Sequence, residues 1–447
     1  MNIQAFGRSA AALAVLASAP AIAVTYGPLE LTGFVKEEFS VCDNCSGGLI
    51  NPSTFDPRGV LSPPTPMLNQ GAEPGRHSAN LGLAMLTAAL THEFDNAVVI
   101  EGKASARERN NDADIVGHYM IDFYAGIKHP QWGLLQAGTI SSRAWSRSDS
   151  FAYPVGLTTS WAESGAGYSV IPVAVRYGTK EFEIPIGKIR FEATYGTAKR
   201  RFPLNPASSK TPPPTPRLFE GFVQYSNEKN LIELIFQGSH GGRQSSFAKG
   251  AFYGANGNTN DPTSAPGYET PKENVFILEG THWFNPAWKL TYGLKRNEWS
   301  GQQQQCDYGP VSPIKSDCFW DQAGFNYWSD NKVHHAIEWD TMLGGGYTRG
   351  IYTFTLGAVR LNKAYVHDPA TTEWGQNNTA TFLNLGVYRK LPEISKNMEI
   401  YAGLGRVMFG SQGPAPLSMP SNTADGNNDP RVTKLGNSIT IGANFIF

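Results

Sequence analysis

Hydrophobic and polar residues alternate with a period of two along most of this chain. The pattern is clearest in 435–447, where mostly apolar residues at odd positions alternate with Gly, Ser, Thr and Asn at even positions. It recurs in 98–107, 118–125, 189–195 and 288–295. Because successive side chains of a β-strand point to opposite faces, each stretch predicts a strand with one apolar and one polar face.

Several of the polar faces carry full charges in the middle of a predicted strand. Lys103 and Arg107 lie on the polar face of one strand and Arg190 on that of another. The dry interior between two stacked sheets does not tolerate unpaired charges, whereas a water-filled lumen does. The pattern therefore favours an all-β fold, a transmembrane antiparallel up-and-down β-barrel, over a soluble sandwich.

Short turns alternate with long Gly-, Pro-, Ser- and Asn-rich connections, which is typical of a barrel with turns at one rim and loops at the other. With 319–331 assigned to a long loop and Gly344–Gly350 to a short turn, the strand number is even, about sixteen. Sixteen strands leave an aqueous bore. The predicted strands are 29–39, 80–92, 97–109, 115–128, 133–140, 172–182, 188–198, 217–227, 230–241, 273–284, 287–299, 333–343, 351–362, 380–391, 398–410 and 433–447.

Composition agrees with this fold and excludes other classes. The 37 basic and 38 acidic residues give a net charge of −1, which provides no attraction for nucleic acid. Charged residues make up 17% of the chain, below the roughly 25% usual for soluble domains. A mean hydropathy of −0.31 excludes a polytopic helical membrane protein.

The amino terminus has the features of a signal peptide. Arg8 precedes an apolar run from Ala10 to Ala19, and Ala21-Ile22-Ala23 has the small-x-small pattern of a cleavage site. We therefore expect residues 1–23 to be removed and 24–447 to form a single exported β-barrel domain.

The four cysteines of this exported chain favour loop-stabilising disulfides over a metal site. Cys42 and Cys45 form a C-x-x-C without neighbouring histidines, and Cys306 and Cys318 flank a polar stretch. Cys306–Cys318 is the favoured pair, but the spacing leaves all three connectivities open.

No motif indicates an enzyme, a cofactor site or a metal site. His334 and His335 are adjacent, so on a strand their rings point to opposite faces. Gly344–Gly346 is followed by no helical pattern, which argues against a phosphate-binding loop. We expect a protein that is not an enzyme and has no cofactor.

Four stretches resemble the general, trimeric porins of Gram-negative bacteria, especially those of betaproteobacterial type. They are 133–138 before the third long connection, 173–177 after it, 385–402 around a short turn, and the terminal Phe447. The resemblance implies a homotrimeric sixteen-stranded channel in the lipid of the Gram-negative outer membrane. Such a channel passes small hydrophilic solutes and ions by passive diffusion.

The resemblance also implies that the third connection, 141–171, folds into the barrel and narrows it. In that family, acidic groups on this loop face basic groups on the opposite wall, and such opposed charges filter solutes by size and charge. The candidates on the loop are Arg143, Arg147, Asp149 and Glu163, and those on the wall, by inward phase, are Lys36, Lys103, Arg107, Arg176 and Arg190. Carboxylates predicted to point inward leave ion selectivity open, with a weak anion preference expected; they are Glu101, Asp122, Glu192, Glu233 and Glu338.

Two alternatives remain at this point: a channel selective for carboxylates, phosphate or sugars, and an exported soluble β-sheet protein that binds ligands. The second connection, about 110–114, is shorter than the one that often latches porin subunits together, so a stable trimer is not assured. Aromatic residues near predicted strand ends favour interfacial girdles. They are Trp132, Trp283, Trp288, Tyr195 and Tyr401.

Overall fold

A computed structural model describes a large part of the chain and most of its regular structure. The described residues are 24–43, 76–111, 117–162, 164–165, 167, 170–197, 217–240, 272–301, 334–363, 365–366, 379–410, 418 and 435–447. The predicted signal peptide 1–23 lies outside them, as do Cys45, Cys306 and Cys318. Cys42 lies in a strand, but its side chain is outside the described part, so the structure does not test the disulfides.

All the strands belong to one antiparallel sheet. They are β1 Val24–Tyr26, β2 Leu29–Asp43, β3 Arg76–Glu93, β4 Val99–Asn111, β5 Gly117–His129, β6 Gly133–Ser141, β7 Val170–Gly178, β8 Phe182–Ile184, β9 Gly187–Thr197, β10 Arg217–Ser226, β11 Asn230–His240, β12 Lys272–Asn285, β13 Trp288–Gly301, β14 His334–Arg349, β15 Tyr352–Leu361, β16 Tyr365–Val366, β17 Ala380–Lys390, β18 Met398–Phe409 and β19 Leu435–Ile446. Two helices, α2 Arg143–Ala152 and α3 Thr158–Ala162, lie between β6 and β7.

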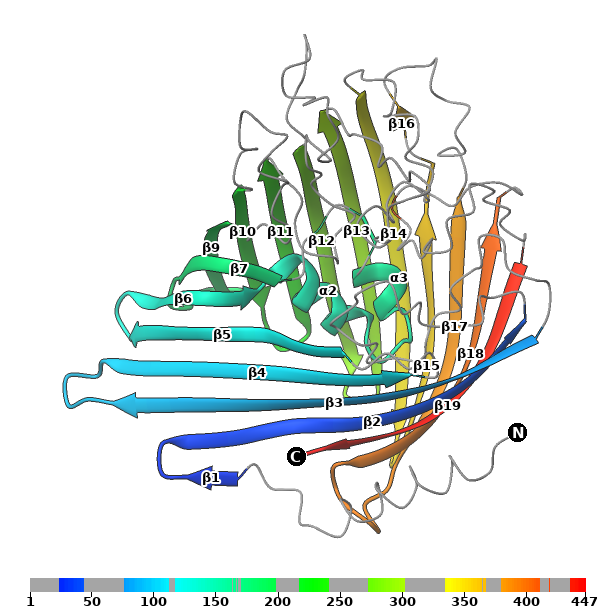
Figure 1. Cartoon of the computed structure of the whole chain (residues 1–447), viewed down its shortest axis with the longest axis horizontal. Helices are drawn as coiled ribbons and strands as arrows, with labels where there is room; N and C mark the ends of the chain where they lie inside the picture. Colours follow the sequence, from blue (N-terminus) through cyan, green and yellow to red (C-terminus); the bar gives the residue numbers. More distant parts are fainter. Residues whose placement is uncertain are drawn as a thin grey trace, which may run out of the picture.

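The sheet closes on itself into a barrel (Figure 1). Each strand pairs with the next along the chain, and β19 pairs with β2 to complete the ring. Three short segments do not count as separate strands of the barrel. β1 pairs only with β2, β8 continues β7 along β9, and β16 continues β15 along β14. The remaining sixteen strands form a closed sixteen-stranded barrel, which confirms the predicted fold class.

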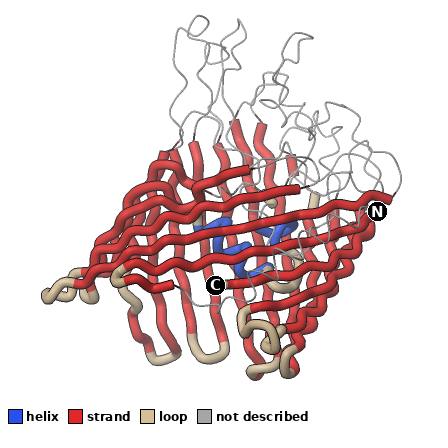
Figure 2. The backbone as a smooth tube through the Cα atoms, turned by 60° about the horizontal axis from the view of Figure 1, so that its bottom comes forward, coloured by secondary structure: helices blue, strands red, loops and turns tan. Residues whose placement is uncertain are grey.

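Each predicted strand corresponds to a strand of the barrel, and the short turns gather at one rim (Figure 2). Several boundaries differ by up to four residues, and the largest error is at the end of β14. Gly344–Gly346 lie inside β14, and the turn comes at Gly350, where φ is +60°. Gly344 instead lets Val155 of the β6–β7 connection lie close to the backbone of β14, because a Cβ on this inward-facing glycine would be only 3.1 Å from both Val155 γ-carbons.

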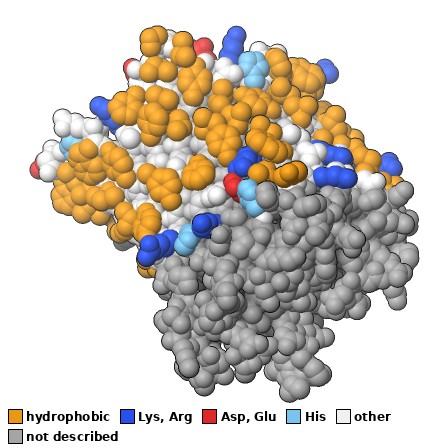
Figure 3. Space-filling view, turned by 90° about the horizontal axis from the view of Figure 1, so that it is seen from above, with side chains coloured by type: hydrophobic (Ala, Val, Ile, Leu, Met, Phe, Trp, Pro, Cys, Tyr) orange, Lys and Arg blue, Asp and Glu red, His pale blue; other side chains and the backbone are white. Residues whose placement is uncertain are grey.

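Along the strands, exposed apolar side chains alternate with buried side chains, many of them polar. On β15, Phe354 and Leu356 are exposed while Thr355 is buried, and on β11 Leu234 is exposed while Glu233 is fully buried. Hydrophobic side chains cover much of the described outer surface on the face seen in Figure 3. Among the described residues, neither helix has the length and apolarity to cross a membrane.

Of the girdle candidates, Trp132, Trp288 and Tyr195 are exposed, as that interpretation requires, and their place at the interface stays a prediction, whereas the interpretation was wrong for Tyr401. Tyr401 is buried, and its hydroxyl hydrogen-bonds to Glu38. Strand phase explains the difference, because Tyr401 alternates with the exposed Ile400 and Leu404 and therefore points inward.

Candidate functional site

The described residues of the segment between β6 and β7, which are 142–162, 164, 165 and 167, contact wall residues on strands from β9 to β18. Helix α2 begins after Ser142, whose Oγ accepts a hydrogen bond from the Trp145 N–H at 3.1 Å. The wall residue Glu220 accepts hydrogen bonds from the N–H groups of Arg143 and Ala144, at 2.8 and 3.1 Å. A carboxylate is favourable at a helix N-terminus because the first N–H groups have no partner within the helix.

Apolar contacts hold this segment against β10–β18. The cluster combines residues of the segment with inward-facing side chains of those strands. Its members are Ala144, Phe151, Ala152, Val155, Leu157, Trp161, Phe222, Ile235, Val275, Ile277, Met342, Val359, Leu361, Ala380, Phe382, Val407 and Phe409. Gly357 on β15 makes room for the segment, since a Cβ there would lie 2.6 Å from Leu157 Cδ1.

Trp161 and Lys295 fix the far end of the segment. The Trp161 indole N–H donates to Glu279 Oε2 at 3.0 Å, and the Lys295 ammonium lies 4.7 Å from the centre of a Trp161 ring. The same ammonium donates to the backbone carbonyls of Trp161 and Ser164, the latter at 3.1 Å. A cation is favourable at these carbonyls because the C-terminal end of a helix carries a partial negative charge.

Two arginines of α2 form ion pairs with wall carboxylates. Arg143 binds Glu192 of β9 through two hydrogen bonds, Nε to Oε2 at 2.6 Å and Nη2 to Oε1 at 2.8 Å. Arg147 binds Glu233 of β11, with Nε 2.8 and 2.9 Å from the two carboxylate oxygens. Burial alone would lower the pKa of the Arg143 guanidinium, but Glu192, together with Glu220 and Glu233, outweighs burial and raises that pKa above its usual value.

Two wall arginines lie beside these pairs. Arg176 of β7 donates to Thr194 Oγ1 at 2.8 Å and forms a 3.2 Å ion pair with Glu220. Arg190 of β9 stacks on the Phe222 ring at 5.6 Å, and Arg143 lies 5.4 Å from the same ring. The four candidates Arg143, Arg147, Arg176 and Arg190 therefore gather beside β9–β11.

Charged candidates on β2 and β4 form a second group. Lys36 pairs with Glu38 at 2.6 Å and interacts electrostatically with Asp149 of α2 and with Arg107. The Arg107 guanidinium lies 5.8 Å from a Trp145 ring. Lys103 pairs with Asp122 at 2.8 Å, and Glu163 lies outside the described residues.

Tyrosines connect the middle of the segment to the last strands. Tyr153 donates to Glu399 Oε1 at 2.8 Å, and Tyr388 donates to the Pro154 carbonyl. Burial and then the nearby Glu399 carboxylate raise the pKa of the Tyr153 phenol, so this hydroxyl stays protonated and can donate.

One residue of the last long connection also reaches this site. Ser418 is fully buried and donates from its backbone N–H to Glu338 Oε2 at 3.0 Å. Its carbonyl accepts a hydrogen bond from the Gly165 N–H at 2.8 Å. Ser418 therefore connects the end of the 141–170 segment to β14.

The polarity at α2 differs from the arrangement that the resemblance implies. Arg143 and Arg147 are basic groups on the loop that face acidic groups on the wall, whereas Asp149 with Lys36 follows the implied order. Sequence reasoning identified the inward carboxylates Glu192 and Glu233 but not Glu220, Phe222, Glu279, Lys295 or Trp161. It also missed α2, although Ser142 followed by the apolar residues 144, 145, 151 and 152, which share one face of a helix, was a usable signal.

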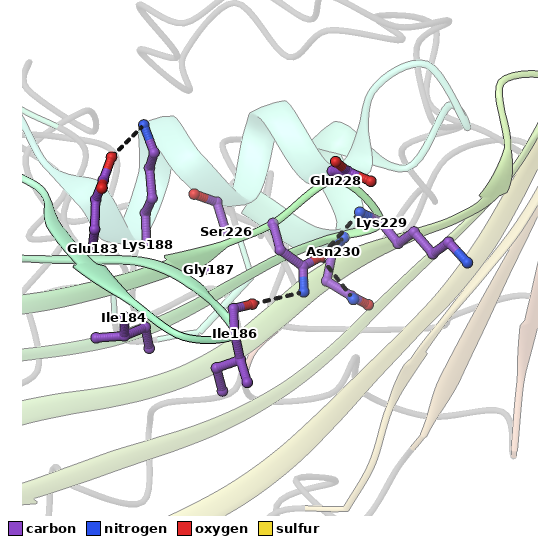
Figure 4. Close-up of a pocket in the computed structure, with 10 residues that line it drawn as sticks. Glu183, Ile184, Ile186, Gly187, Lys188, Ser226, Glu228, Lys229 and Asn230 are labelled. Carbon is purple, nitrogen blue, oxygen red and sulfur yellow. Dashed lines mark hydrogen bonds and ion pairs between the residues drawn. The ribbon is translucent and has the colours of Figure 1, made fainter.

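A separate groove of about 720 Å³ lies between two short turns, one joining β8 to β9 and the other β10 to β11 (Figure 4). Lys188, Glu183, Glu228 and Lys229 are among its lining residues. None of the segment's residues named above lines it, so this groove is a feature of the short-turn rim and not of the constriction candidates.

Comparisons with known proteins give one consistent structural result. No protein-family model matches the chain, and no curated protein matches its sequence. Among solved structures, OmpF of Salmonella typhi in complex with daunomycin has a TM-score of 0.56 at 9% identity, covering 95% of this chain and 100% of that one. The anion-selective porin of Comamonas acidovorans has a TM-score of 0.54 at 12% identity, covering 94% and 99%. The outer-membrane channel DcaP of Acinetobacter baumannii has a TM-score of 0.53 at 9% identity, covering 94% and 97%.

These similarities extend over nearly the whole of each chain, including the ring of sixteen strands. At such low identity they concern the backbone and not the side chains of the site. The chain therefore has the fold of the outer-membrane porins.

Proposed function

We propose that this protein is a porin of the Gram-negative outer membrane, a water-filled channel through which small hydrophilic solutes and ions diffuse passively. The observation that carries the proposal is the opposite chemistry of the two faces of one closed barrel. Exposed Leu, Ile and Phe side chains suit lipid, and charged side chains such as Lys36, Glu233 and Lys295 point inward.

The constriction of this channel is the 141–171 segment. Its support is the set of contacts with Glu192, Glu233, Glu279 and Glu399, which come from strands spread over much of the ring. Charges fixed on both sides of a narrow aqueous passage discriminate among solutes by size and charge.

The partners of the channel are outer-membrane lipid and two further copies of the chain. A homotrimer fits the outward side of β3 and β4, an apolar face on which small residues such as Ala84 and Ala88 alternate with the exposed Leu86 and Leu90. Mass measurement of the detergent-extracted protein tests this part, since a mass of one chain would contradict the trimer.

Conductance in a planar lipid bilayer tests the channel itself. We expect stepwise insertions whose conductance rises with salt concentration without saturating at low concentration. A neutral sugar of small size should enter protein-containing liposomes, and a large oligosaccharide should stay outside. Folded, inserted protein that carries no current would refute the channel. A protein that is soluble without detergent after export would favour the soluble ligand-binding alternative.

A further inference from the structure

Arg190 differs from the other arginines of the site in its bonding, an observation that bears on which solutes the proposed channel recognises. None of the described residues accepts a hydrogen bond from its guanidinium, and its Nε is buried without a partner among them. Its ion pair with Glu192 is long, at 3.9 Å, and 30% of its side chain is exposed. A guanidinium carries five N–H donors in a planar fork, so this one has donors available for a ligand.

The surroundings of Arg190 are electropositive despite nearby carboxylates. Four guanidiniums meet three carboxylates here, and two of the guanidiniums, Arg143 and Arg147, interact electrostatically with Arg190. The carboxylates are Glu192, Glu220 and Glu233, and the other two guanidiniums are Arg176 and Arg190 itself.

The carboxylates are also less accessible than the guanidiniums. Side chains of Glu192 and Glu233 are 7% and 0% exposed, whereas Arg143 and Arg147 are 24% and 23% exposed. A solute entering here therefore meets guanidinium groups before carboxylates.

Phe222 holds the two nearest guanidiniums apart and in place. Its ring lies 5.4 Å from Arg143 and 5.6 Å from Arg190. Arginines held by stacking and by buried carboxylates lose little conformational freedom when they bind an anion, which favours affinity.

A lysine near the short-turn rim lies on the same strand as Arg190. Lys188 is two residues away on the same face of β9, about 6.6 Å along the strand. Lys188 and Lys229 line the 720 Å³ groove, and in Figure 4 Lys188 points to the same side as Glu183 and the helix behind it. Lys188 is half exposed and forms only long ion pairs, 3.6 Å to Glu181 and 4.0 Å to Glu183, so it can exchange them for a passing anion.

We propose that Arg190, together with Arg143 and Arg147, forms an oxyanion-binding station for small solutes that carry carboxylate or phosphate groups. Lys188, two residues away on the same face of β9, adds a cation between the short-turn rim and this station. This inference rests on the proposed function, because it names the solute class that the channel retains during passage. It places recognition on the loop side of the lumen, where the loop itself contributes two guanidiniums.

Single-channel current in the presence of inorganic phosphate or succinate, at constant ionic strength, tests the station. We expect at least one of these anions to reduce the chloride current of the wild-type protein in a saturable manner. Arg190→Gln should raise the half-blocking concentration at least about tenfold, because the free guanidinium is lost. The replacement removes no hydrogen bond between described residues, so the barrel should still fold.

Two further variants make the result specific. Arg190→Lys keeps the charge without the planar fork and should give intermediate block, and it serves the test if the Gln variant fails to insert. Arg296→Gln is the control. Arg296 and its ion-pair partner Glu298 alternate along β13 with the buried Lys295 and therefore lie on the outer face, so this variant should leave the block unchanged.

The outcomes separate the station from the channel. Conducting wild-type protein that neither anion blocks, or that glucose blocks equally well, overturns the station and leaves the porin intact. An unchanged half-blocking concentration in Arg190→Gln also overturns it. Folded protein without any current overturns the proposed function instead.

Discussion

The inside of this barrel has two unlike halves. Strands β10–β18 present Phe, Ile, Val and Leu side chains that pack against the β6–β7 connection, together with buried charges such as Glu233 and Lys295. Among the described residues, strands β2–β9 contribute none of the wall residues of this large apolar cluster, and their inward side chains are mainly charged and in ion pairs. In the first half, inward-facing positions bury apolar surface as a soluble core does. In the second, they hold fixed charges. The difference shows that one barrel wall can anchor a loop by apolar contacts along some strands and hold fixed charges toward the lumen along others.

Trp161→Ala should give the largest effect on the apolar half. It removes the bond to Glu279, the contact with Lys295 and a buried ring, and losses of this kind cost about 3–5 kcal/mol. We expect a lower thermal midpoint of the barrel and larger, noisier current steps. Trp339→Ala is the control, because Trp339 is exposed on the outer side of β14. Quiet steps of unchanged size would show that the apolar half does not hold the constriction.

Arg147→Gln tests the charged contact between α2 and the wall. Glu233 would remain buried without its cation, at a cost of about 1.5–3 kcal/mol for the lost charged hydrogen bonds. The reversal potential in a salt gradient should move toward cations. In the double variant with Glu233→Gln, both the potential and the thermal midpoint should return toward the wild-type values. If the double variant is as perturbed as the single one, the pair does not act as a unit.

Gly357→Val places a side chain where Leu157 now packs. Overpacking at such a position costs about 1–3 kcal/mol, and we expect it to displace the segment toward the charged half and reduce conductance. Gly345→Val is a matched control on the neighbouring strand, since the nearest atom to its new Cβ is 3.4 Å away. Equal conductance in the two variants would contradict packing at Gly357.

Tyr153→Phe should give the smallest effect. It deletes one hydrogen bond to Glu399 and keeps the ring, so a loss of about 0.5–1.5 kcal/mol is expected. We expect steps of normal size with more frequent brief closures in long recordings. Records indistinguishable from those of the wild type would mean that the bond adds nothing to the rigidity of the segment.

The barrel was predictable from the sequence because its rule is local. Alternation within a dozen residues decides which side chains face lipid. It predicts inward positions for Lys103, Arg176 and Arg190, which pair with Asp122, Glu220 and Glu192. The glycines of β14 show the limit of such reasoning. Gly344 resembled a turn residue, but its role depends on Val155, nearly two hundred positions earlier in the chain.

The pairing at the site could not be predicted for the same reason. Inward phase gave Glu192 and Glu233 as carboxylates of the lumen, but their arginine partners depend on the path of 141–170 across the barrel. That path is set by apolar residues such as Phe222 and Val275, which pack against the connection. Alternation gives the face of the strand on which such a residue lies, but it does not give the residue's contacts. The preference of the channel for anions or cations can be inferred only when both partners of each ion pair in the lumen are known.

The junction of β2 with β19 has a consequence for biogenesis. Ser40 and Thr440 hydrogen-bond at 2.6 Å across it, and the backbones of Gly33 and Phe447 exchange two hydrogen bonds, although some four hundred residues separate these positions. The other neighbouring strands of the ring follow one another along the chain, so their contacts join residues closer in sequence, whereas contacts between distant residues form slowly. We therefore expect the connection between β6 and β7 to reach its place inside before β2 and β19 pair. A chain that lacked β2 or β19 would have two unpaired sheet edges, and unpaired edges promote aggregation.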